Sequence, residues 1–128
     1  MSNINDPLDW VTKAEGDYTL ARSALRRKLP ITFGACFHAQ QCAEKYMKAM
    51  LVARKQRFSK IHDLAVLNKQ CEDNGIFIGV SKVDLQMLAF YAVETRYPGA
   101  EPSVEDSQVA TKIASAVRKF ARKYLNVK

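Results

Sequence analysis

Apolar residues recur along most of the chain at the three- and four-residue spacing of an α-helix, and helix-breaking residues divide this pattern into five segments. The first segment predicts a helix from about Pro7 to Lys28. Asp6 is a favourable N-cap residue for this helix, and a proline suits the first helical position. Because Leu29 and Pro30 follow, we expect the helix to end there. The chain has no series of alternating apolar and polar positions that would predict a sheet.

The second segment, about residues 31–55, is the most apolar of the five. Its apolar residues cover more than half of the helix circumference, whereas a helix at the surface needs only one apolar stripe. We therefore predict that this helix is central and packs against several neighbours. The polar positions that remain share one edge of it, and they are His38, Gln41, Lys45 and Lys48.

A third and shorter helix is predicted over about residues 61–74, with Gly75 as its natural stop. This boundary places His62 and Asp63 in the first turn, where the helix dipole alone would explain the aspartate. Residues 76–80 have the composition of a strand, but a single short strand would have no partner. We expect a linker there that packs its apolar side chains.

The last two helices are delimited by strong local signals. Ser81 and Asp84 resemble a capping box at the start of the fourth helix, and residues 98–99, Pro-Gly, end it. The fifth helix covers about residues 104–125 and carries a single apolar stripe. Short connections between long helices favour antiparallel neighbours. The fold class predicted is therefore all-α, an up-and-down bundle of four to five helices.

The chain has 128 residues, enough for one well-packed core, so residues 1–128 are expected to form a single domain. No apolar run is long enough to span a membrane, and the first residues do not resemble a secretory signal, so we expect a cytoplasmic protein. Neither the cysteines nor the histidines have metal-ligand spacing, and we expect reduced cysteines, no metal and no cofactor. The three cysteines are Cys36, Cys42 and Cys71.

Twenty Lys and Arg residues against thirteen Asp and Glu give a net charge of +7, which favours acidic or polyanionic partners. Solvated helix faces explain such an excess equally well. In an up-and-down bundle the ends of successive helices alternate between two poles. One pole combines residues 54–60 with the end of the last helix and carries the denser group of cations. This pole is the stronger candidate for an anion-binding site.

Four groups of residues match a known pattern. They are Trp10, Ala14, Asp17 and Ala21 in the first helix, the block FHAQQCAEKYMKAML at 37–51, His62, Asp63, Leu64 and Leu67, and Arg96, Tyr97 and Pro98. Together these residues, spread over about 10–98, resemble the HEPN domain (higher eukaryotes and prokaryotes nucleotide-binding). The branch is the one often paired with minimal nucleotidyltransferases. The block in the second helix is the most specific of the four.

The resemblance implies a helical bundle that forms a homodimer and acts with a small nucleotidyltransferase in a toxin–antitoxin-like pair. In some branches of the family the domain cleaves RNA with an Arg-x4-6-His motif near the start of a late helix. The late helices of this chain lack that motif, but Arg57 and His62 have its spacing at the entrance to the third helix. A metal-independent ribonuclease would use His62 as a general base and Arg57 to stabilise the phosphate charge.

The candidate binding residues follow from the polar edge of the second helix and from the resemblance. His38, Gln41, Lys45 and Lys48 offer imidazole, amide and ammonium groups to a nucleotide or RNA, although a solvated edge and a hydrogen-bonded structural histidine are the alternatives. Arg96 and its neighbour Tyr97 are anion-binding candidates, or Arg96 forms a structural ion pair.

The sequence thus predicts a non-catalytic nucleotide- or RNA-associated module. A ribonuclease that uses Arg57 and His62 is one alternative, and a purely structural dimerisation domain is another.

Overall fold

The computed structural model describes residues 5–58, 62–94, 98–99 and 101–128, and the regular elements in these ranges are all helices. In chain order they are α1 (Pro7–Arg26), α2 (Thr32–Ala53), α3 (Leu64–Asp73), α4 (Lys82–Glu94) and α5 (Val104–Tyr124). The prediction of an all-helical bundle is confirmed. Among the described residues, no helix combines the length and the apolar character needed to cross a membrane.

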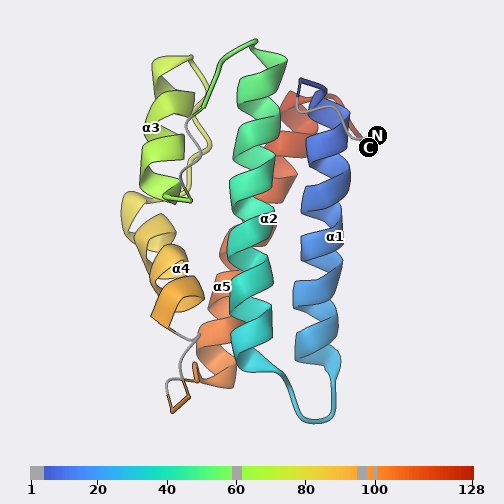
Figure 1. Ribbon diagram of the computed structural model, residues 1–128, viewed down its shortest axis with the longest axis vertical. Helices are drawn as coiled ribbons and strands as arrows, with labels where there is room; N and C mark the ends of the chain where they lie inside the picture. The colour runs from blue at the N-terminus through green and yellow to red at the C-terminus, as the bar shows by residue number, and fades with distance from the viewer. Residues whose placement is uncertain (1–4, 59–61, 95–97, 100) are drawn as a thin grey trace.

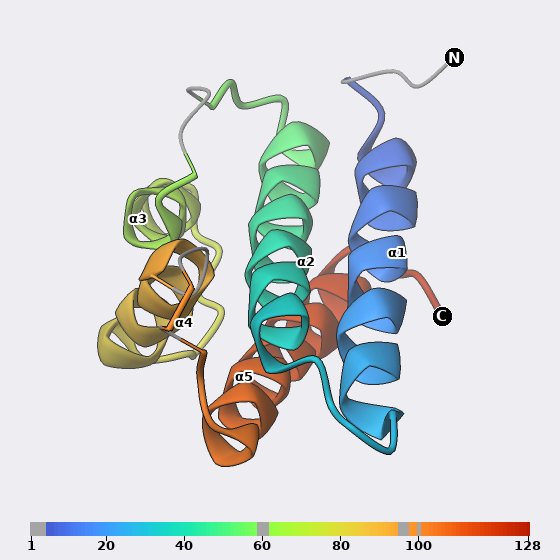
Figure 2. The ribbon, with the colours of Figure 1, turned by 60° about the horizontal axis from the view of Figure 1, so that its bottom comes forward.

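Helix α2 occupies the middle of the bundle. It lies antiparallel to α1 on one side, while α3 and α4 lie one above the other on its opposite flank (Figure 1). Helix α5 runs obliquely across the same side of both α1 and α2, as the tilted view shows (Figure 2). Each of the other four helices packs directly on α2. The central position predicted for the second helix is therefore confirmed, and its wide apolar surface is explained by four separate contacts.

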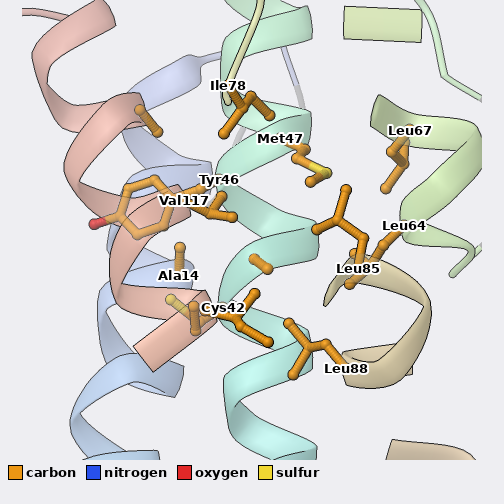
Figure 3. Packing of buried hydrophobic residues seen from close by; sticks show 14 of the residues in the cluster. Ala14, Cys42, Tyr46, Met47, Leu64, Leu67, Ile78, Leu85, Leu88 and Val117 are labelled. Carbon is orange, nitrogen blue, oxygen red and sulfur yellow. The ribbon is translucent and has the colours of Figure 1, made fainter. Parts of the chain in front are cut away.

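The core surrounds α2 on three sides (Figure 3). Met47 of α2 faces the leucines of α3 and α4, whereas Cys42 and Tyr46 lie toward Ala14 of α1 and Val117 of α5. The three cysteines are free and buried, as expected. Burial raises the pKa of the Cys36 and Cys71 thiols to about 12, and that of the Cys42 thiol still further, so all three stay protonated.

Side-chain capping fixes the start of most of the helices. The side chain of Asp6 accepts a hydrogen bond from the backbone N–H of Leu8, and that of Ser81 accepts one from Asp84. The third helix departs from its predicted start, because Asp63 is its N-cap and accepts from the backbone N–H groups of Ala65 and Val66. His62 and Asp63 therefore precede the helix instead of forming its first turn.

The segment between α3 and α4 is a linker, as expected for a short apolar stretch with no strand to pair with. Ile76 and Ile78 are buried in the core, whereas Phe77 between them is largely exposed. Gly75 and Gly79 have φ values of +77° and +84°, in the left-handed region that glycine adopts without steric cost. These two turns let a short extended segment place alternate side chains into the core.

Candidate functional site

A carboxylate on α1 organises the polar edge of α2. Asp17 is only 7% exposed, and its Oδ1 atom lies 2.8 Å from Nδ1 of His38. The Nζ atom of Lys45 donates to the other oxygen, Oδ2, over 2.6 Å. His38 and Lys45 are two turns apart on the same edge of α2. The single carboxylate of Asp17 therefore binds side chains from both turns. The side chains of His38 and Lys45 keep exposed fractions of 29% and 24%.

Gln41 lies between these two residues on the helix and completes the edge. Its amide nitrogen donates to Oε1 of Gln40 over 2.8 Å, and its side chain is half-buried. Next to it, the ring of Phe37 meets the His38 imidazole edge-to-face, with 5.2 Å between centroids. The structure therefore brings His38, Gln41 and Lys45 together at the boundary between the core and solvent.

A second carboxylate, Glu44, lies deeper in the molecule and is 2% exposed. It accepts hydrogen bonds from Nζ of Lys48 over 2.9 Å and from the amide of Gln40 over 3.1 Å. Nδ1 of His62 lies 3.0 Å from each of its oxygens. Burial acts to raise the pKa of Glu44, but these hydrogen bonds outweigh it and hold the pKa below the usual value for glutamate. Glu44 is therefore ionised at neutral pH.

Lys48 is separated from the rest of the predicted polar edge. Its side chain is only 7% exposed, and its ammonium group is paired with Glu44. The same nitrogen lies 5.5 Å from the centroid of the Trp10 ring and 5.1 Å from that of Phe58. The structure thus places Lys48 in a cage formed by α1, α2 and the segment after α2, and it leaves His38, Gln41 and Lys45 as the accessible group.

The two residues of the Arg-x4-His spacing differ in how they are held. His62 is 74% exposed but is anchored through Nδ1 to the buried Glu44 carboxylate, and its main-chain oxygen accepts from Gln40 over 3.2 Å. The side chain of Arg57 is exposed, and its main-chain oxygen accepts from Gln70 over 3.5 Å. The other two predicted anion-binding residues, Arg96 and Tyr97, lie outside the described residues.

Sequence reasoning did not select Asp17 as a site residue, although the structure makes it the centre of the site. A signal was present, because Ala14, Asp17 and Ala21 occupy one face of α1 and the other two are fully buried. An acidic residue within a stripe of buried alanines needs a cationic partner. The partners themselves follow 21 and 28 residues later in the chain, and the sequence alone does not indicate them.

Comparison with known proteins agrees with this architecture. The HEPN domain family model matches residues 8–124, which is nearly the whole chain. The chain belongs to the HEPN family. This HEPN domain is also similar to the crystal structure of TT1696 from Thermus thermophilus, with a TM-score of 0.77 and 25% sequence identity. The similarity covers 94% of this chain and 98% of TT1696. The comparison with curated proteins gives no match.

Proposed function

We propose that this HEPN domain is a non-catalytic module that binds a nucleotide or RNA at the edge of α2 formed by His38, Gln41 and Lys45. The observation that supports this function is the pairing of His38 and Lys45 with one buried carboxylate, Asp17. Both side chains are held in place before any ligand arrives, which lowers the entropy lost on binding.

Each of the three side chains keeps groups for a ligand. Asp17 engages Nδ1 of His38 and so leaves Nε2 as the second hydrogen-bonding atom of the ring. The Gln41 amide presents a donor and an acceptor side by side, which suits the edge of a base. One N–H of Lys45 is directed to Asp17, and the two others remain for a phosphate oxygen or a hydroxyl.

The other three predicted binding residues are not part of the site proposed at the edge of α2. We assign Lys48 to the fold, because a ligand would have to displace its pair with Glu44 and open the Trp10 and Phe58 cage. Arg96 and Tyr97 stay predicted anion-binding residues.

A nucleotide panel and two glutamine variants test the binding proposal. A ligand that binds the native state raises the melting temperature, so the nucleotide that raises it most is chosen for calorimetry. We expect Gln41→Ala to weaken its binding by roughly three- to tenfold, in line with the loss of one hydrogen bond. Gln108→Ala, which removes an exposed amide on α5, is the matched control. If no nucleotide or short RNA binds, the domain is instead a purely structural dimerisation module.

The proposed module is a homodimer, and α4 supports this part. Three large apolar side chains on α4 are more than half exposed, namely Val83, Phe90 and Val93. Together they present on the order of 300 Å² of apolar surface, over a third of the roughly 800 Å² per partner that a stable interface buries. Residues 85–93 carry no charge, so this stretch of α4 adds no charge repulsion between two copies of this basic chain.

The spacing along α4 also fits a contact between identical copies. Val83 and Phe90 are seven residues apart, about two helical turns, and so lie on the same face of α4. Two antiparallel copies of α4 related by a two-fold axis midway between these residues would therefore bring each Val83 against Phe90 of the second copy.

We further propose that the dimer acts with a small nucleotidyltransferase in a toxin–antitoxin-like pair. The support for this partner is family membership together with the motif at 37–51, which resembles the nucleotidyltransferase-associated branch. Co-expression with a nucleotidyltransferase encoded in the neighbouring reading frame tests the pairing. A stable complex on gel filtration supports it, and separate elution of the two proteins contradicts it.

A second candidate function is metal-independent RNA cleavage, and the Glu44–His62 pair is the observation that favours it. A buried carboxylate bound to Nδ1 fixes the orientation of an exposed imidazole and leaves its Nε2 atom directed away from the carboxylate. Nε2 of His62 would take the proton of a ribose 2′-hydroxyl while its oxygen attacks the adjacent phosphorus. The bond from phosphorus to the 5′-oxygen then breaks and leaves a 2′,3′-cyclic phosphate, and the 5′-oxygen takes a proton from water and departs as a hydroxyl. Arg57 would stabilise the charge on the phosphate.

A further inference from the structure

The interface between α1 and α5 gathers more positive than negative charge. Glu15 of α1 accepts two hydrogen bonds from Arg118 of α5, over 2.8 Å from Nε and 2.7 Å from Nη2. Arg122 approaches the same carboxylate to 3.6 Å and donates to the Tyr46 hydroxyl, which in turn donates to Glu15. These bonds, that of Arg118 first, hold the pKa of Glu15 below its usual value despite partial burial.

About one turn further along α1, the ring of Tyr18 contacts two guanidinium groups. The guanidinium carbon of Arg118 is 4.4 Å from the ring centroid and that of Arg22 is 5.6 Å from it. The Tyr18 hydroxyl lies 3.4 Å from Oγ of Ser115 on α5. Two cations and two hydroxyl groups therefore converge at the exposed side of the α1–α5 contact.

We propose that Arg22, Arg118 and the Ser115 hydroxyl form a phosphate-binding site between α1 and α5. The site takes the phosphate group of a nucleotide or of an RNA backbone. It is formed by residues of α1 and α5, whereas Asp17 of α1 pairs with residues of α2, so the site shares no side chain with the nucleotide site proposed above.

Ion pairs within the α1–α5 cluster do not neutralise its positive charge. Three guanidinium groups, on Arg22, Arg118 and Arg122, face one carboxylate, that of Glu15, so the side chains of the cluster carry a net charge of +2. Arg118 uses Nε and Nη2 on Glu15, which leaves Nη1 for a further acceptor. Arg22 is exposed, and among the described residues its guanidinium contacts the Tyr18 ring and no carboxylate.

The arrangement also suits a phosphate in its geometry. A guanidinium presents parallel N–H groups that match two phosphate oxygens, and a hydroxyl donor adds a third contact. Arg118 is already fixed by two hydrogen bonds and a ring, with 28% of its side chain exposed, so it loses little freedom on binding.

Titration with inorganic phosphate, followed by the NMR signals of the arginine Nε–H groups in the full-length protein, tests the proposal. We expect the Arg118 signal to shift with saturation. Arg22→Gln should weaken binding by roughly tenfold, as the loss of one charge-assisted hydrogen bond implies. Lys82→Gln is the control, because it removes one positive charge from an exposed side chain at the start of α4 and should leave the affinity within about twofold.

Equal weakening in the two variants would show unspecific attraction to a basic protein and would overturn the site, as would the absence of a shift at Arg118.

Adenosine monophosphate and a short single-stranded RNA then distinguish the sources of the phosphate. A tighter response to the mononucleotide indicates a nucleotide site. A tighter response to RNA with a steep dependence on salt indicates backbone binding. Neither result depends on the Gln41 experiment, so the two proposals fail or stand separately.

Discussion

Nδ1 of His62 lies 3.0 Å from both carboxylate oxygens of Glu44, although the imidazole is 74% exposed and the carboxylate is almost completely buried. The pair therefore links the surface to the interior across the α2–α3 connection. On the inner side, the same carboxylate binds Lys48. Glu44 thus serves both an internal cation, which belongs to the fold, and an external imidazole, which is available for chemistry.

Incubation with RNA decides between the binding module and the ribonuclease. A non-catalytic module leaves the RNA intact even at high protein concentration, and this is the outcome we expect. The ribonuclease alternative requires products with 2′,3′-cyclic phosphate ends that disappear in His62→Ala. His38→Ala, purified in parallel, controls for contaminating nucleases, because a contaminant's activity would be the same in both preparations. Circular dichroism checks that His62→Ala remains folded after it loses the Glu44 bond.

The Glu44–Lys48 pair should contribute far more to stability than a similar pair at the surface. Lys48→Met leaves a buried carboxylate without its main cation, and we expect a loss of about 3 kcal/mol in the free energy of unfolding by urea. The matched control is Lys69→Met, which breaks the Lys69–Asp73 pair with the same i, i+4 spacing and a 2.7 Å distance. Its lysine is 73% exposed, so this loss should stay below about 1 kcal/mol.

A double variant separates the charge effect from the packing effect. Glu44→Gln combined with Lys48→Met removes both buried charges and should recover much of the lost stability, because neither ion is left without its partner. If Lys48→Met and Lys69→Met prove equally mild, Lys48 is not locked in the fold. Lys48 would then again be a candidate ligand-binding residue on the edge of α2.

The sequence predicted what depends on local signals. Ser81 caps α4 as expected, and the apolar surface of α2 gave its central position, because capping and helical periodicity involve residues within one or two turns. The start of α3 was predicted too early, since the side chain of Asp63 bonds to N–H groups that follow it. That choice between a cap and a first turn is decided by dihedral angles, which composition does not fix.

The candidate site on α2 was predicted only in part, because its limits depend on contacts between segments that are distant in the sequence. His38, Gln41 and Lys45 do share an accessible edge, but Lys48, less than one turn further on, is covered by Phe58 from the connection after α2. The extent of a buried helix face depends on which distant segment packs beside it. The pairing of Asp17 with Lys45 likewise joins two helices, so periodicity within either helix does not reveal it.

The last prediction concerns the exposed apolar face of α4. A homodimer through this face should have about twice the 14.4 kDa mass of the chain in light scattering after gel filtration. Phe90→Lys places a charge at the centre of the contact and should yield the monomer, because burying an unpaired ammonium costs more than the face gains. Leu20→Lys makes the same kind of change at a half-exposed leucine on α1 and should leave the dimer intact. A wild-type protein that is monomeric at all concentrations contradicts the homodimer, and a dimer that survives Phe90→Lys but not Leu20→Lys moves the interface to α1.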